Sequence, residues 1–119
     1  MINLSSTVSS ILCNDATLTG LLGGERVYLI RAPNADEYPR ITFFELNNYG
    51  SNFADDTELE SEIKYQIDVW HKGNPNPIAL EVDRVMQENG FIRTYSTDIY
   101  EDDTNVFHKA LRYRTQTEG

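Results

Sequence analysis

The sequence predicts one α+β domain, spanning residues 1–119, in which a mostly antiparallel, mixed sheet of about five strands has helices packed on one face. A length of 119 residues suits a single hydrophobic core. Five segments have the β-branched and aromatic composition of strands, and two regions space their apolar residues as helices do. Because the strand segments alternate apolar with polar residues, we expect an antiparallel sheet with one exposed face.

Apolar residues at helical spacing predict three helices. Residues 4–22 are predicted to form two short helices, of which the second follows the N-cap candidate Asp15 and ends at a pair of glycines. A longer amphipathic helix is predicted later in the chain, with Asn76 as its N-cap, Pro77 at its first position and Gly90 beyond its end.

The strand segments differ in how clearly they alternate. The clearest is 62–69, where four apolar residues predict a buried face and four polar residues an exposed one. Residues 50–60 have no period and one strong apolar residue, Phe53, so we expect an exposed loop there, and 98–105 are predicted to connect a hairpin. The predicted strands are 27–30, 40–46, 62–69, 91–97 and 106–114.

The charge of the chain argues against two classes of partner. Nineteen acidic and ten basic side chains give a net charge of −9, which repels nucleic-acid phosphates and anionic lipid headgroups. We expect no membrane contact, neither a signal peptide nor an anchor, and no specific DNA binding. The single cysteine, Cys13, allows neither an intrachain disulfide nor a cysteine-based zinc site, so a reducing cytoplasm is predicted.

Patterns typical of catalytic or cofactor sites are missing from the sequence. His71 and His108 lie outside any metal-binding motif, no serine has a nucleophile-elbow context, and the glycine-rich segment 20–26 lacks the ending of a P-loop. We therefore expect a protein that is not an enzyme and that uses no metal or cofactor.

Two acidic runs and several aromatic residues are the candidate functional positions. The acidic runs lack the pattern of a calcium-binding loop, and they are interpreted either as solvated loops or as a functional acidic surface. Tyrosines suit interfaces but also cover strands, and both interpretations stay open. The acidic residues are Asp55, Asp56, Glu58, Glu60, Glu101, Asp102 and Asp103, and the interface candidates are Tyr49, Phe53, Trp70 and Tyr100.

A set of short motifs between about residues 26 and 114 resembles a known family. Its most specific element is the strand ending Gln66-Ile67-Asp68-Val69-Trp70, followed by the amphipathic helix. With these motifs, the chain resembles the small tail-component family of long-tailed bacteriophages and prophages. The other motifs are 26–28, 38–43, 90–91, 98–103 and 108–113.

This resemblance implies a tail-terminator-like domain that caps the head-proximal end of the tail tube as a ring, commonly of six subunits, and allows head–tail joining. The implied partners are further copies of the chain, the tail-tube protein and the head connector, with DNA passing through unbound. The implied location is the bacterial host cytoplasm during assembly and then the virion tail. The family offers no catalytic residues; Pro39 would set a strand entry, Ile67 and Val69 would be buried, and Trp70 would close the strand.

Alternative functions lead to different expectations. A head-completion or connector adaptor would use the same kind of ring on the other side of the joint. A small metal-dependent hydrolase would use clustered carboxylates such as Asp102 and Asp103. In a tail ring, the run from Asp55 to Glu62 would either line an acidic lumen or belong to a segment that orders on docking.

Overall fold

The computed structural model describes residues 4–33, 37–54, 57–102 and 105–117, and it confirms the predicted α+β class. The described chain contains three helices and one five-stranded sheet. In chain order the elements are α1 (Ser5–Cys13), α2 (Ala16–Leu22), β1 (Val27–Leu29), β2 (Arg40–Ala54), β3 (Thr57–His71), α3 (Asn76–Glu88), β4 (Ile92–Glu101) and β5 (Val106–Thr117).

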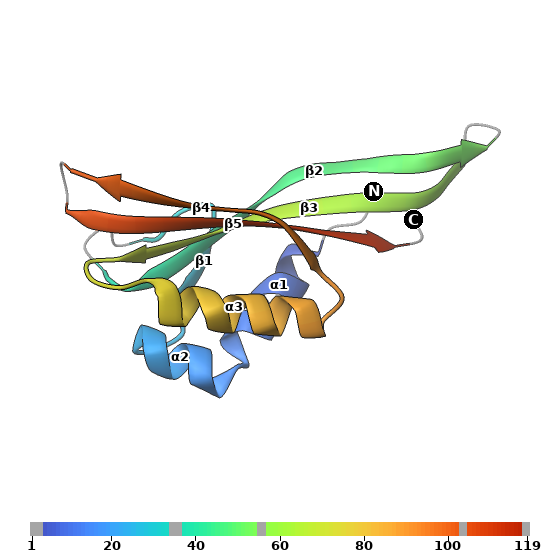
Figure 1. Cartoon of the computed structure of the whole chain (residues 1–119). Helices are drawn as coiled ribbons and strands as arrows, with labels where there is room; N and C mark the ends of the chain where they lie inside the picture. Colours follow the sequence, from blue (N-terminus) through green and yellow to red (C-terminus); the bar gives the residue numbers. More distant parts are fainter. Residues whose placement is uncertain (1–3, 34–36, 55–56, 103–104, 118–119) are drawn as a thin grey trace.

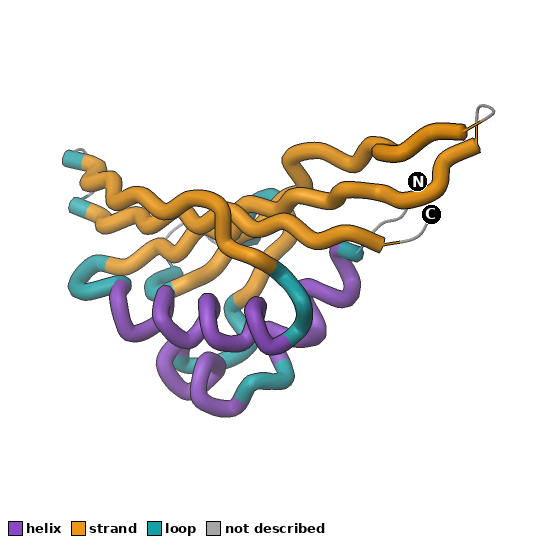
Figure 2. Tube along the Cα trace, turned by 45° about the vertical axis from the view of Figure 1, so that its right-hand side comes forward, coloured by secondary structure: helices purple, strands orange, loops and turns teal. Residues whose placement is uncertain are grey.

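The sheet is mixed, as predicted, and its helices lie on one side. Its strand order is β1-β2-β3-β5-β4, in which β1 and β2 are parallel and every other neighbouring pair is antiparallel. Figures 1 and 2 show the three helices packed on the same face, while the opposite face carries no helix. We call this second surface the open face.

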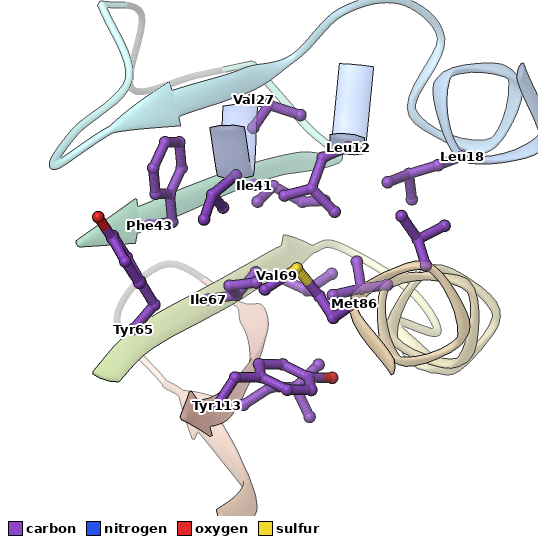
Figure 3. Close-up of a cluster of buried hydrophobic side chains, with 14 of the residues drawn as sticks. Leu12, Leu18, Val27, Ile41, Phe43, Tyr65, Ile67, Val69, Met86 and Tyr113 are labelled. Atoms are coloured by element: carbon purple, nitrogen blue, oxygen red, sulfur yellow. The ribbon is translucent and has the colours of Figure 1, made fainter. Parts of the chain in front are cut away.

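Strand β3 supplies the centre of the hydrophobic core. The predicted alternation is confirmed, because Ile63, Tyr65, Ile67 and Val69 each expose 0% of their surface. These side chains meet the apolar residues of the helices, such as Met86 of α3 (Figure 3). Burying residues of this size contributes about 1.5–3 kcal/mol each, so β3 holds the helical layer to the sheet.

The helix ends follow the predicted capping residues at α2 but not at α3. Asp15 Oδ2 accepts a hydrogen bond from the Leu18 backbone N–H at 3.0 Å, which confirms the N-cap of α2. The prediction for Asn76 was wrong, because Asn76 is already the first residue of α3. The side chain of Asn74 accepts the Asn76 N–H at 3.0 Å, so the chain satisfies this donor from outside the helix.

The prediction of a loop at 50–60 was also wrong. Strands β2 and β3 continue through this segment, with Ser51 paired to Glu60 and Phe53 paired to Glu58. This part of the hairpin extends past the helices (Figure 1), so no core imposes an apolar alternation on its sequence. We call residues 47–54 and 57–62 the arm.

The hairpin between β4 and β5 has a shorter connection than predicted. Residues 98–101, expected to lie in the connection, belong to β4 and pair with β5, from Asp98 with Lys109 to Glu101 with Val106. A register shift lies between Arg93 and Tyr95 of β4. Strand β4 forms the outer edge of the sheet on this side.

Truncating a core residue of β3 tests this description. We expect Ile67→Ala to lower the free energy of unfolding by about 2–5 kcal/mol, because it leaves a cavity between the sheet and the helices. The matched control is Leu80→Ala on α3, a side chain that is 71% exposed, with an expected change within about 0.5 kcal/mol. Urea unfolding measures both, and equal effects would contradict this placement of the core.

Candidate assembly interface on the open face

The open face is formed by alternate residues of four strands. Arg40 of β2 pairs with Trp70 of β3, and Trp70 pairs with His108 of β5, so these three side chains belong to one row across the sheet. Gln66 of β3, Arg112 of β5 and Tyr95 of β4 form a second row. By register, aromatic and cationic residues thus belong to the face of the sheet that carries no helix.

Trp70 is held on the open face by stacking and by a hydrogen bond. Its indole stacks on the His108 imidazole, with centroids 4.0 Å apart and planes inclined by 12°. The indole N–H donates a hydrogen bond of 2.9 Å to Thr42 Oγ1, and the Arg40 guanidinium lies 5.2 Å from the Trp70 centroid. These contacts hold the indole against the sheet and limit the rotamer freedom that an interface residue would lose on binding.

A buried carboxylate, that of Asp68, forms a hydrogen bond with the histidine of this stack. Asp68 is 4% exposed, and its Oδ1 lies 2.7 Å from His108 Nε2. Because an ionised carboxylate only accepts hydrogen bonds, the imidazole N–H is the donor. Gln66 Nε2 donates a second bond of 2.8 Å to the same oxygen. Buried polar groups need hydrogen-bond partners. Here the bond to Asp68 fixes the orientation of the His108 ring that stacks on Trp70.

The second row is also tied together. Arg112 Nε donates to Gln66 Oε1 at 3.0 Å, and the Arg112 guanidinium lies 4.8 Å from the Tyr95 centroid. A shallow hollow beside this pair is lined by Leu46, Lys64, Thr94, Tyr95 and Arg112. The open face therefore offers a hollow with an aromatic side chain and two cations in its wall.

Tyr28 lies at the β1 end of the sheet, where it pairs with Thr42 of β2. Its hydroxyl donates a hydrogen bond to Glu37, and this bond raises the pKa of the tyrosine above its usual value. The phenol therefore stays neutral at physiological pH and is not a base. In the part of the chain that the structure describes, no group of three or more His, Cys, Asp or Glu side chains could hold a metal ion. Among the same residues, no helix has the length and apolar character needed to cross a membrane.

The four predicted interface residues do not form one patch. Trp70 lies in the open-face network described above. Tyr100 of β4 is 47% exposed, packs on Phe107 with centroids 4.8 Å apart, and by register belongs to the opposite side of the sheet. Tyr49 and Phe53 are in the β2 half of the arm, paired with Glu62 and Glu58.

The two acidic runs are at opposite ends of the sheet. Glu58 and Glu60 belong to the arm, while Glu101 ends β4 and Asp102 is exposed in the turn after it. Figures 1 and 2 show the arm and the β4–β5 turn at opposite ends of the molecule. One carboxylate oxygen of Glu101 lies 4.0 Å from His108 Nδ1. Three residues of the predicted acidic surface, Asp55, Asp56 and Asp103, lie outside the described residues.

Sequence reasoning missed most of the open-face network. Arg40, Asp68, Arg112 and Tyr95 were not among the candidate site residues, and His108 was noted only as lying outside any metal-binding motif. Their only sequence signal is that they alternate with core positions along their strands. Which of them meet depends on strand pairing, and a single sequence without known pairing does not reveal it.

Comparisons with known proteins agree with the resemblance seen in the sequence. A family model described as tail completion protein gp17 matches residues 7–118. Among solved structures, a chain from the virion of a native gene transfer agent particle superposes with a TM-score of 0.71 at 17% sequence identity, covering 94% of this chain and 92% of that chain. No curated protein sequence matches significantly. The structural likeness supports the fold.

Removing the acceptor of the tryptophan N–H tests the network. We expect Thr42→Val to lower the free energy of unfolding by about 1–2 kcal/mol, because the indole N–H of Trp70 loses its acceptor, the hydroxyl of Thr42, a residue that is 5% exposed. Urea unfolding followed by the fluorescence of the single tryptophan measures this. Thr97→Val on β4 of the same face is the control, with a change within about 0.5 kcal/mol. An equal loss in both variants would show that the Trp70 bond contributes nothing.

Proposed function

The chain belongs to the tail completion protein gp17 family, and from this membership we propose that it assembles as a ring that caps the head-proximal end of a phage tail and allows head–tail joining. The family match over residues 7–118 is the observation that carries the proposal, because it covers almost the whole sequence. Membership makes the chain a phage tail assembly component. The capping ring, with an expected six subunits, is the proposed detail.

The open face supports an assembly role. Aromatic residues and arginines are enriched in the contact regions of protein interfaces, and Trp70, Tyr95 and Arg112 are of these types. They are held in place by hydrogen bonds and stacking before any partner binds. Such preorganised side chains lose little entropy on docking, which favours contact with a subunit or a tail protein.

The proposed partners are further copies of the chain, the tail-tube protein and the head connector. The net charge of −9 favours a ring through which DNA passes without binding, since like charges repel within the Debye length. We propose a structural, non-catalytic role that begins in the host cytoplasm and ends in the virion tail.

Deleting the gene from a phage or prophage that carries it tests this function. We expect filled heads beside unjoined tails, some of abnormal length, when lysates are viewed by negative-stain electron microscopy. A plasmid copy of the gene should restore joined virions, which controls for effects on neighbouring genes. Normal joined virions in the deletion strain would contradict the proposal.

The side of the joint on which the protein acts needs a second measurement. We expect the purified protein to bind isolated tails and to appear at their head-proximal end by immunogold labelling. Binding to isolated heads, with none to tails, would identify a head-completion adaptor instead.

A further inference from the structure

A hollow of about 500 Å³ lies at the β1 side of the open face. Apolar and aromatic side chains form part of its wall, and one of them is the Trp70 indole that His108 and Thr42 hold in place. Concave surfaces of this kind receive the side chains of a partner. We call it the corner hollow, and its lining includes Ile30, Arg31, Pro33, Arg40, Thr42 and Trp70.

The backbone at Ile30, beside the corner hollow, is strained. Its φ of 71° is in the left-handed region, which a β-branched residue seldom adopts. Two backbone hydrogen bonds of 2.8 Å hold it there, from the Ile30 N–H to Phe43 O and from the Arg31 N–H to Leu29 O. The Ile30 side chain is 69% exposed as a result. Strain that persists in a fixed backbone is typical of functional positions.

Arg31 gives the corner hollow a cation that is available to a partner. The residue is exposed, and its side chain has no hydrogen bond or ion pair with another described residue. The guanidinium of Arg40 is already engaged, because it lies 4.5 Å from the Tyr38 centroid and 5.2 Å from that of Trp70. A partner that fills the hollow is therefore expected to bring a carboxylate to Arg31.

The far end of the β4–β5 hairpin carries exposed apolar side chains. We call residues 98–102 and 105–108 the hairpin end. Ile99, Tyr100 and Phe107 are 45%, 47% and 42% exposed. Tyr100 packs on Phe107, with centroids 4.8 Å apart, and its hydroxyl donates a hydrogen bond of 3.0 Å to Asn105 Oδ1. An aromatic side chain held in this way loses little entropy on binding.

The hairpin end also supplies a carboxylate. Asp102 follows two residues after Tyr100, is exposed, and pairs with no other described residue. Asp98 adds to the negative charge, since its side chain is 73% exposed although one oxygen lies 3.1 Å from Lys109 Nζ. The charges of the hairpin end and of the corner hollow are thus complementary, and each lies next to exposed apolar groups.

These two features lie on opposite edges of the sheet, whose outer strands are β1 and β4. Three antiparallel pairings separate the two strands, so β1 and β4 run in opposite directions. Both features are near the same level along the strands, because Ile99 aligns through β5 with Trp70, a residue of the hollow. Copies placed side by side in one orientation therefore bring the hairpin end of one to the corner hollow of the next, with antiparallel edges.

Exposed apolar residues also match on both sides of these edges. By register Ile99 is on the open-face side of β4, and Ile30 lines the hollow on that side. Tyr100 is on the helical side, as is Leu29 of β1, which is 51% exposed beside α1. An edge contact can therefore cover apolar groups on both faces of the sheet.

We propose that the hairpin end of one chain docks at the corner hollow of a second copy of the same chain. Asp102 pairs with Arg31 of the second copy, Ile99 contacts its Ile30, and Tyr100 contacts its Leu29. This inference rests on the proposed ring, for which it supplies the contact between subunits. Because the two surfaces differ, the contact is heterologous, and repeated copies close into a ring when the rotation fits.

Two other occupants of the corner hollow fit the observations less well. The carboxylates around α3, Glu81, Glu88 and Asp15, are already paired with Arg84 of the same chain. DNA would meet a protein of net charge −9. The hairpin end combines an available carboxylate with exposed apolar side chains.

A charge swap in the full-length protein tests the contact. The variants are Arg31→Glu, Asp102→Lys, and both changes together. We expect each single variant to raise the dissociation constant of the oligomer about fivefold or more, and the double variant to return it to within about twofold of the wild type. Native mass spectrometry over a concentration series measures the assembly, and circular dichroism verifies folding.

The matched control for charge is Glu88→Lys, at the end of α3. It changes the net charge as much as Asp102→Lys does, at a side chain that is 62% exposed on the helical side. We expect this control to assemble like the wild type. Dissociation of the control to the same extent would show that net charge, and not the hairpin contact, sets the assembly.

Truncating the apolar residues of the hairpin end tests the other half of the contact. We expect Ile99→Ala with Tyr100→Ala to raise the dissociation constant about tenfold or more, because both side chains lose the partner surface that covers them. Leu21→Ala with Leu80→Ala removes two exposed apolar side chains from the helices and should leave assembly unchanged. Equal effects in the two variants would contradict the proposed contact.

Further outcomes would overturn the inference. These are a double charge variant that stays dissociated, an oligomer that persists in both single variants, or a wild type that is monomeric throughout. Fluorescence anisotropy with labelled duplex DNA completes the test, and DNA binding that Arg31→Glu abolishes would assign the hollow to nucleic acid instead. An oligomer unaffected by the charge swap removes the hairpin contact alone, whereas joined virions after gene deletion remove the proposed function.

Discussion

The alternation of side chains along β3 is the constraint on which the rest of the structure depends. Between residues 63 and 69, one face of this strand is buried in the core shared with the helices, through Ile63, Tyr65, Ile67 and Val69. The other face begins the open-face network, because Asp68 and Trp70 alternate with these core residues. A shift of one residue in pairing would exchange the two faces, burying the polar residues under α3 and exposing the core. The same strand then continues into the arm, so core, open face and arm are aligned by one register.

The sequence was sufficient to predict the features that depend on burial or on local hydrogen bonds. The alternation at 62–69, the stripe of α3 and the cap at Asp15 all have such causes. The arm could not be predicted in the same way, because its strands pair beyond the helical layer and carry no hydrophobic period. At α3, Asn74 supplies the acceptor that was expected from Asn76, a difference of local turn geometry.

The sequence predicted the types of residue at the candidate site better than it predicted which residues contact one another. Trp70 was found as an aromatic residue at a strand end, but its partners Thr42 and His108 are 28 and 38 residues away in the chain. Tyr100 was chosen by the same reasoning. It belongs to the other side of the sheet, because it alternates with the open-face residues of β4. The open-face side chains are already held in place by contacts within the chain, and no helix covers them. For a member of the tail completion family, this is consistent with a surface that another protein covers during assembly.

Electron cryomicroscopy of finished tails tests the central claim, that the open face is an assembly surface, most directly. Our account predicts a ring of this protein at the head-proximal end, in which Trp70, Tyr95 and Arg112 of each subunit are covered by a neighbouring chain. A ring in which these side chains face solvent, with subunits joined through the helices, would contradict the account.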